Sequence, residues 1–371
     1  MKKSQKDMLP HSEAKVSLLE KYLEAFLAVI ANDNFTKAIH AFDLFAGEGI
    51  YPNGKAGSSV TIARQFMRLK QARSNAESCP DLYLYFNDRN QAKVDSTLEA
   101  LEGNGIGEDS GIAISPTCDK YENILPNVVS KVDSLGDEKS FIFIDPYGYK
   151  AVKPQDISRL LKGGKSEVLL FQPTQFLFRF TQSGTPKALS DFTAELGQGK
   201  KWPENLDIWG YVNHVRYLFS EYVGKNYFVD IFTIQKDPST VFCLFFFTSH
   251  IRGFEKMLDT KWKLNESTGR GWHFEQYGDT LDLFHTPQIN PLQNILIESL
   301  NEYPLSNGEA YELTLRSGFR PTHCVEVLKS LQNQGKIEVT LSDGKKARKG
   351  SFYINYENFK KRPARVLIKI A

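Results

Sequence analysis

Apolar residues recur with a helical spacing in some segments of the chain and as short continuous runs in others. In residues 12–30, Leu18, Tyr22 and Phe26 lie four positions apart, which predicts a helix with one broad apolar face. Short apolar runs predict five strands, at Ile39–Phe45, Leu82–Asn87, Gly111–Ser115, Phe141–Ile144 and Glu167–Phe171. Helical segments, among them residues 154–162, alternate with these strands, so we expect a parallel sheet covered by helices on both faces.

The pattern changes in the middle of the chain. Two apolar runs, Tyr227–Ile234 and Val241–Thr248, are separated by a polar segment that contains Asp237-Pro238. This arrangement predicts an antiparallel hairpin. Five parallel strands completed by a hairpin predict an α/β fold, a Rossmann-like seven-stranded methyltransferase sheet with a β-hairpin finish. They fit this sheet better than the six parallel strands of the nicotinamide-binding fold.

The C-terminal part has a different element order. A helix near residues 250–264 and a connector at Asn265–Gln288 lead to three helices and two strands, at Leu292–Glu302, Gly308–Ser317, Pro321–Gln334, Ile337–Leu341 and Ser351–Tyr356. The two strands flank a basic tip at residues 343–350, which is the pattern of a winged helix. We therefore expect a Rossmann-like domain over residues 1–288 and a winged-helix domain over residues 289–371.

Composition and charge refine this picture. The formal net charge is +2, but residues 336–371 alone carry +7, so the remainder carries −5. A basic tail of this kind indicates contact with a polyanion. The four cysteines are scattered without a C-x-x-C pair, which argues against a zinc site, an iron–sulfur site or a disulfide framework. Neither a signal peptide nor a membrane span is expected, and we predict a cytoplasmic protein.

The turn after the first strand carries the first candidate site residues, in Phe42-Asp43-Leu44-Phe45-Ala46-Gly47-Glu48-Gly49. A strand that ends in G-x-G lets the backbone approach a nucleotide-like ligand, because no Cβ intervenes. The carboxylate of Asp43 needs a partner at an apolar strand end, and the ammonium group of S-adenosyl-L-methionine (SAM) would supply one. The alternative is a tight turn in which Asp43 bonds nearby backbone.

Two further acidic residues complete the expected cofactor contacts. Asp88 follows the second strand, where a carboxylate holds ribose hydroxyls in nucleotide-binding sheets. Asp119 follows the weaker third strand and is a candidate for the adenine edge. The alternatives are a surface turn for Asp88 and a helix cap for Asp119. Together with Asp43, Phe45, Gly47 and Gly49, these residues form the predicted SAM site.

The segment after the fourth strand, Asp145-Pro146-Tyr147-Gly148, predicts the catalytic residues. Methyltransferases that act on amino groups carry an acid or amide here, followed by two prolines and an aromatic residue, and this sequence lacks the second proline. We expect Asp145 to orient or deprotonate the acceptor and Tyr147 to pack on it. The alternative is a Pro–Gly turn with Tyr147 on the sheet. The carboxyl ends of parallel strands share one edge, so Asp43, Asp88 and Asp145 are expected to converge.

Basic residues of the C-terminal domain are candidates for phosphate or partner-protein contacts. They lie near the predicted helices and in the wing: Arg316, Arg320, Lys345, Lys346, Arg348 and Lys349. Contacts of this kind give salt-dependent affinity for a nucleic-acid backbone without reading its sequence. A protein-interaction domain with a solvated charged wing explains the same residues equally well.

The sequence also resembles the three-Cys-motif partner (TcmP-like) proteins over nearly its whole length. The resemblance lies in short motifs: His11-Ser12-Glu13-Ala14-Lys15, Leu19…Tyr22-Leu23, Phe45-Ala46-Gly47-Glu48-Gly49-Ile50-Tyr51, Gly57-Ser58, Phe245-Phe246-Phe247-Thr248, Gly253…Met257 and the C-terminal winged helix. It implies SAM binding through Asp43, Gly47, Gly49 and Asp88. It also implies a bacterial setting and a partner protein with a three-cysteine, radical-SAM-like motif. Glu48 and Ser59 depart from the pattern, since the family tends to have proline at both positions.

Three hypotheses follow from the sequence. The leading one is methyl transfer from SAM to an amino or hydroxyl acceptor. The second is a catalytically degenerate SAM-binding module that docks a partner protein or nucleic acid through its winged helix. The third is a nicotinamide oxidoreductase, which the hairpin finish and the long spacing between Gly49 and Asp88 both disfavour.

Overall fold

A computed structural model describes residues 7–31, 33, 35–74, 79–148, 152–172, 174–175, 178, 186–203, 206–237, 240–273 and 289–371. The chain divides into two compact units. The first holds the described residues up to His250 and Gly271–His273, and the second holds Ile251–Arg270 and the described residues from 289 onward. This division differs from the expected boundary at residue 288, because helix α9 (Ile251–Leu264) belongs to the second unit.

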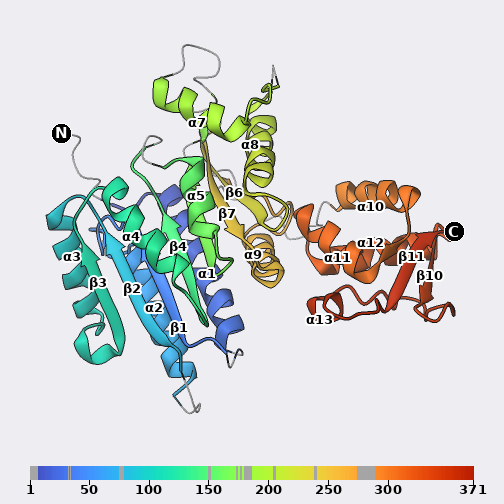
Figure 1. Ribbon diagram of the computed structural model, residues 1–371, viewed down its shortest axis with the longest axis horizontal. Helices are drawn as coiled ribbons and strands as arrows, with labels where there is room; N and C mark the ends of the chain where they lie inside the picture. The colour runs from blue at the N-terminus through green and yellow to red at the C-terminus, as the bar shows by residue number, and fades with distance from the viewer. Residues whose placement is uncertain are drawn as a thin grey trace. The chain divides into compact units, whose positions relative to one another are not determined.

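The first unit is built on one mixed sheet with the strand order β3-β2-β1-β4-β5-β7-β6-β8 (Figure 1). Strands β1 to β5 run parallel to their neighbours, and β7 is antiparallel to both β5 and β6. The strands are β1 (Ala38–Asp43), β2 (Asp81–Asn87), β3 (Ile112–Thr117), β4 (Glu138–Ile144), β5 (Ser166–Gln172), β6 (Phe228–Asp237), β7 (Thr240–Thr248) and β8 (Gly271–His273).

The expected parallel sheet with a hairpin finish is therefore present, but it has eight strands and not seven. The additional strand β8 lies within the segment expected to be a connector, and it pairs in parallel with β6. Residues 274–288 of that connector lie outside the described residues. The order of the first five strands is that of a Rossmann-like α/β fold.

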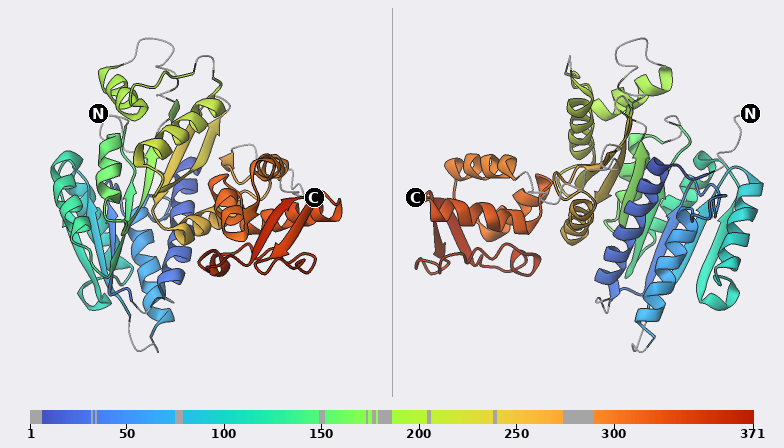
Figure 2. Two further views of the ribbon diagram at one scale, coloured as in Figure 1. Left: turned by 45° about the vertical axis from the view of Figure 1, so that its right-hand side comes forward. Right: turned by 180° about the vertical axis from the view of Figure 1, so that it is seen from behind.

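Helices cover both faces of the sheet (Figure 2). One face carries α1 (Pro10–Ala31), α2 (Ser58–Ala72) and α3 (Gln91–Gly103). The other face carries α4 (Tyr121–Asp133), α5 (Pro154–Leu161) and α8 (Ile208–Val223), and the remaining helical elements of this unit are η1 (Glu108–Ser110) and α7 (Lys187–Gly197). Helix α1 begins two residues earlier than expected, because Pro10 suits a first helical turn and the carbonyl of Leu9 accepts from Ser12 and Glu13.

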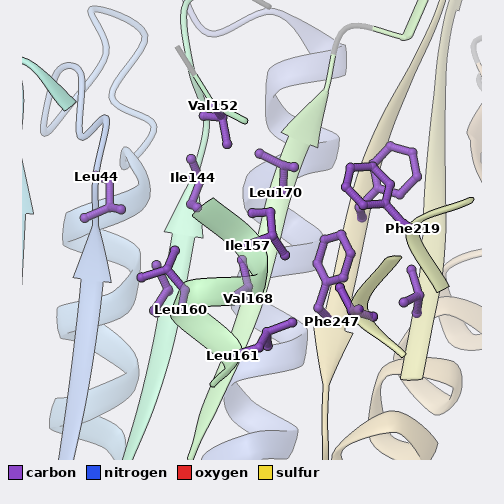
Figure 3. Close-up of a cluster of buried hydrophobic side chains, with 14 of the residues drawn as sticks. Leu44, Ile144, Val152, Ile157, Leu160, Leu161, Val168, Leu170, Phe219 and Phe247 are labelled. Carbon is purple, nitrogen blue, oxygen red and sulfur yellow. The ribbon is translucent and has the colours of Figure 1, made fainter. Parts of the chain in front are cut away.

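Apolar side chains fill the space between the sheet and these helices. Figure 3 shows Ile144, Val168 and Leu170 of the central strands against Ile157 and other side chains of α5, all of them buried. On the opposite face, Tyr22 of α1 packs on Phe141 and Phe246, with ring centroids 5.9 and 4.8 Å away. Both faces of the central strands are thus covered, which explains why their sequences are continuous apolar runs.

The second unit combines helices with a small antiparallel sheet of order β10-β11-β9. Its elements after α9 are α10 (Asn290–Glu302), β9 (Leu305–Ser306), α11 (Asn307–Arg316), α12 (Pro321–Asn333), β10 (Ile337–Leu341), α13 (Tyr356–Phe359) and β11 (Val366–Ile370). Helix α9 is anchored here by polar contacts: Tyr311 donates to Glu255, and Nε1 of Trp262 donates to the carbonyl of Gly318 at 2.9 Å. These bonds join α9 to the second unit.

One strand of this unit was predicted wrongly. The partner of β10 is β11, which pairs Ile337 with Ile370, and residues 351–356 form no strand. Phe352 and Ile354 are nevertheless buried, with 1% and 5% of their surface exposed. Their alternating apolar pattern therefore reflects packing of a loop into the core and not membership of a ladder. None of the helices in the described residues is long and apolar enough to cross a membrane.

Candidate functional site

The candidate site lies at the carboxyl ends of the parallel strands, where the strand order reverses between β1 and β4. Ligands of open α/β sheets bind at such a switch point, because the loops on either side diverge. Asp43 ends β1, while Asp88 and Asp145 directly follow β2 and β4. The N–H of Gly47 donates to Oδ2 of Asp88 at 3.2 Å, so the turn after β1 and the end of β2 are in contact.

Asp43 is completely buried and only half satisfied. Its Oδ2 accepts hydrogen bonds from Ser58 and Ser59 at 2.6 and 2.7 Å, at the start of α2. Its Oδ1 is buried and has no hydrogen-bond partner among the described residues. Burial raises the pKa of this carboxyl to about 6, against the opposing effects of the two serines and of the backbone N–H of Phe45, and the nearby Asp145 adds to the increase. A buried carboxyl with one unused oxygen is energetically costly without a ligand.

Glycine is required at the two positions of this turn for different structural reasons. Gly47 has a φ of +67°, which favours glycine, and a Cβ there would lie 3.4 Å from the hydroxyl of Tyr147. A Cβ on Gly49 would lie 2.7 Å from Cβ of Ala100 and 2.8 Å from Cα of Thr97, both in α3. We expected both glycines to admit a cofactor. The close approach of α3 by itself explains Gly49, whereas Gly47 lies beside Asp88 and Tyr147.

Asp88 is buried, and both of its oxygens have partners. Oδ1 accepts from the N–H of Asn90 at 2.9 Å, and Oδ2 accepts from the hydroxyl of Tyr147 at 2.7 Å in addition to Gly47. Nζ of Lys93 lies 2.8 Å from the same hydroxyl and 4.6 Å from the ring centroid of Tyr147. Tyr147, which we expected at the acceptor, therefore lies against the residue expected to hold the ribose. Tyr147 as a whole residue is 58% exposed.

Phe45 and Asp119 occupy the flank of this edge. The Phe45 ring stacks on Tyr121 at 5.3 Å and meets Tyr147 edge-on at 6.5 Å. The exposed side chain of Asp119 accepts from Asn123 and from the N–H of Lys120, both at 2.7 Å, and these bonds lower its pKa. Asp119 thus contacts residues at the start of α4 but does not cap it, since the N-cap position is Lys120, and no described contact directs its carboxylate toward Asp88.

Asp145 forms an ion pair that the sequence did not predict. Nζ of Lys15 lies 2.5 Å from Oδ2 of Asp145, with only 12% and 24% of the two side chains exposed, and 4.1 Å from the ring centroid of Phe171. His11, one turn earlier in α1, has its pKa lowered to about 4 by burial and by the positive charges of Lys236 and Lys15. Lys15 lies in the run used for the family resemblance, but nothing local indicates its partner.

The basic candidates of the second unit fall into two groups. Nε of Arg316 lies 2.8 Å from Oε1 of Glu312, and the guanidinium of Arg320 contacts His323 at 2.9 Å, so neighbouring side chains engage both arginines. The other four are exposed in the loop between β10 and β11: Lys345, Lys346, Arg348 and Lys349. Among them, Nζ of Lys345 lies 3.4 Å from Oδ2 of Asp343. Across the described part of both units, no group of three or more His, Cys, Asp or Glu side chains is arranged to hold a metal ion.

No protein-family model and no curated protein matches this sequence. Among solved structures, the O-methyltransferase TomG from Streptomyces achromogenes, involved in tomaymycin synthesis and solved in complex with SAM, is 14% identical with a TM-score of 0.35. The match covers 61% of this chain and 78% of that protein. An O-methyltransferase from Bacillus cereus in complex with SAH is 10% identical over 61% of this chain and 80% of its own length, with a TM-score of 0.31. Similarity this low assigns no activity, so the functional conclusion depends on the residues of the site.

Proposed function

We propose that the first unit binds SAM at the carboxyl edge of its sheet and transfers the methyl group to an amino or hydroxyl acceptor. The observation that carries this proposal is the unpartnered Oδ1 of Asp43, completely buried at the end of β1. A cationic ligand group would favour the ionised carboxylate and offset the cost of burying it. The ammonium group of SAM is such a cation, whereas a dinucleotide brings anionic pyrophosphate to this turn.

The neighbouring residues fit the rest of the cofactor. Gly47 leaves the backbone bare beside Asp88, and the Asp88 carboxylate accepts hydroxyl hydrogen bonds, as its bond with Tyr147 illustrates. Ribose hydroxyls would take the place of the Tyr147 hydroxyl. Because Tyr147 is more than half exposed, its side chain can turn outward with little loss of buried surface.

SAM supplies an activated methyl group on a sulfonium that is a good leaving group, so the protein contributes mainly alignment. Lys15 fixes Oδ2 of Asp145 at the end of β4. The carboxylate can then accept a hydrogen bond from the N–H or O–H of the acceptor and take up its proton. Lys15 acts as a positioning residue in this scheme.

The test is isothermal titration of the full chain with SAM, S-adenosylhomocysteine and NAD, alongside the Asp43→Asn variant. We expect micromolar binding of SAM and S-adenosylhomocysteine that is strongly weakened in the variant, and no binding of NAD. A folded wild-type protein that binds neither sulfur compound would contradict the proposal and favour a docking module. Binding of NAD alone would favour the oxidoreductase.

For the second unit, we propose a winged helix whose β10–β11 loop contacts a nucleic-acid backbone. Helices α10, α11 and α12 with the β10-β11-β9 sheet support the assignment, and the four exposed basic residues of the loop support the contact. Replacing Lys345, Lys346, Arg348 and Lys349 by alanine should weaken binding to a short DNA or RNA duplex and flatten its dependence on salt. Arg316→Ala is the matched control, since Glu312 already engages that arginine. Unchanged binding in the loop variant would instead favour contact with a partner protein.

A further inference from the structure

Five buried side-chain polar atoms in the described part of the chain lack a hydrogen-bond partner: Oδ1 of Asp43, Nε2 of Gln172, Oε1 of Gln175, Oη of Tyr211 and Nε2 of His214. Such atoms are rare in folded proteins, because each forfeits its hydration without compensation. Asp43 belongs to the proposed cofactor site. The other four come from just two segments, the end of β5 with the residues that follow it, and the first turns of α8.

The topology brings these two segments to the same edge of the sheet. Strand β5 ends at Gln172, and β6 runs in the same direction because both strands are antiparallel to β7. Helix α8 precedes β6 and returns across the face of the sheet, so its first turns lie at the edge where β5 ends. That is also the edge of Asp43 and Asp145, and in the β4–β5 register Ile144 is paired with Leu170.

Ring contacts join the two segments directly. Phe178, shortly after Gln175, lies 5.5 Å from the ring of Tyr211. Trp202 stacks on Tyr211 at 5.6 Å and meets His214 edge-on at 5.1 Å. These contacts bring Tyr211 against the segment that follows β5, and Trp202 joins Tyr211 to His214.

The chemistry of the four groups defines what they can hold. Glutamine side chains do not ionise, burial raises the pKa of Tyr211, and burial with the nearby Lys200 lowers the pKa of His214. All four are thus neutral at pH 7. A charged ligand would be left without a counter-charge at these atoms, which is costly. A neutral ring that both donates and accepts hydrogen bonds fits the amide of Gln172, the amide oxygen of Gln175 and the hydroxyl of Tyr211.

We propose that Gln172, Gln175, Tyr211 and His214 form the acceptor site, and that the acceptor is a neutral, planar nitrogen heterocycle of the nucleobase type. The identification as an acceptor rests on the proposed function. In the transfer, the nitrogen lone pair forms the new N–CH3 bond while the S–CH3 bond breaks. S-adenosylhomocysteine leaves as a neutral thioether, and the proton released by the nitrogen passes to the carboxylate of Asp145.

Tyr211→Phe is the most informative variant, because it keeps the ring and removes only the unpartnered hydroxyl. Adenosine, guanosine, cytidine and uridine are the probes, titrated calorimetrically into the full chain with and without S-adenosylhomocysteine. We expect at least one nucleoside to bind, and the variant to bind it about 10-fold more weakly. Its melting temperature should be equal to or above that of the wild type, since a buried polar group without a partner is gone. Tyr22→Phe, which removes a bonded buried hydroxyl, should lower the melting temperature and leave nucleoside binding unchanged.

Failure of this proposal is distinguishable from failure of the proposed function. If SAM binds but no nucleoside does, or if Tyr211→Phe binds the nucleoside as well as the wild type, the acceptor site is overturned and the SAM site stands. If a nucleoside binds through Tyr211 but SAM does not, the ligand site stands and methyl transfer is overturned. Gln172→Met provides a second variant of similar shape should Tyr211→Phe fail to fold, and it should weaken nucleoside binding to a similar extent.

Discussion

The sheet of the first unit buries one carboxyl group at the carboxyl ends of its strands and another near their amino ends. Asp43 lies at the carboxyl end of β1, and Glu167 lies near the amino end of β5. Burial raises the pKa of Asp43 to about 6 and that of Glu167 to about 7. Oε2 of Glu167 accepts from Tyr22 in α1, and Oε1 accepts from Thr248 in β7 at 3.0 Å. Asp43 leaves one oxygen without a partner among the described residues.

The difference separates a structural carboxyl from a ligand-binding one. Glu167 joins α1, β5 and β7, so its hydrogen-bonding capacity is used within the fold. Asp43 is buried as well, but side chains donate hydrogen bonds only to its Oδ2. Native proteins break local rules of this kind mainly at functional sites, which is why a raised pKa alone does not distinguish the two groups while the unpartnered oxygen does.

The largest expected effect tests this comparison directly. Asp43→Asn should weaken SAM binding by about 10- to 100-fold, because a charge-assisted hydrogen bond contributes about 1.5–3 kcal/mol. Glu167→Gln is the matched control at the opposite edge and should leave the SAM dissociation constant unchanged. Isothermal titration measures both. Equal losses in the two variants would show that the effect arises from general destabilisation.

A substitution at Gly49 tests whether this glycine at the carboxyl edge is needed for packing. Gly49→Ala should lower the free energy of unfolding by about 1–3 kcal/mol, because the new Cβ would meet Ala100 and the backbone of Thr97 in α3. Gly103→Ala, where nothing lies within 4 Å of the added Cβ, serves as the control and should not destabilise the protein. Urea denaturation followed by circular dichroism measures both. A stable Gly49→Ala variant that has lost SAM binding would show that Gly49 is needed for cofactor binding.

The pH dependence of the free energy of unfolding tests whether Glu167 is a structural carboxyl. Its pKa in the folded protein is raised from 4.5 to about 7, so the folded state binds the proton more tightly than the unfolded state. The resulting stability is complete below pH 4.5 and is lost as the pH rises through about 7, up to about 3 kcal/mol. Histidines with a lowered pKa, such as His11 and His323, add stability as the pH rises to about 6.5, so the contribution of Glu167 is measured as the difference between the wild type and Glu167→Gln. The stability of the wild type relative to Glu167→Gln, taken from urea midpoints, should fall as the pH rises from 4.5 to about 7, and a constant difference would assign the pH dependence to another group.

The smallest effect concerns Tyr147. Tyr147→Phe removes one hydrogen bond to Oδ2 of Asp88 and leaves that oxygen more accessible to a ribose hydroxyl. SAM affinity should rise about fivefold, since a hydrogen bond of this kind contributes about 1 kcal/mol net. Tyr303→Phe, at an exposed tyrosine of the second unit, is the calorimetric control. Weaker SAM binding by Tyr147→Phe would show that the hydroxyl supports the cofactor and does not compete with it.

By itself, the sequence determined the parallel sheet, its hairpin finish and the acidic strand ends. Buried strands must be continuous apolar runs, and the carboxyl ends of parallel strands must meet at one edge, so Asp43, Asp88 and Asp145 were predictable from local pattern. The element order of the second unit was predictable for the same reason, apart from one strand. The partner protein with a three-cysteine motif stays a prediction, since a single chain does not test it.

Only the tertiary structure decided which groups meet. Lys15 reaches Asp145 across 130 residues of sequence, and Ser58 and Ser59, in place of the proline expected at position 59, bind Asp43. The lack of hydrogen-bond partners near Tyr211 follows from the packing of α8 on the sheet, which the sequence does not show. An alternating apolar pattern looks the same in a ladder strand and in a buried loop, which explains why β11 was missed. Local pattern determines which surface of a segment is buried, and the partner that covers it depends on long-range packing.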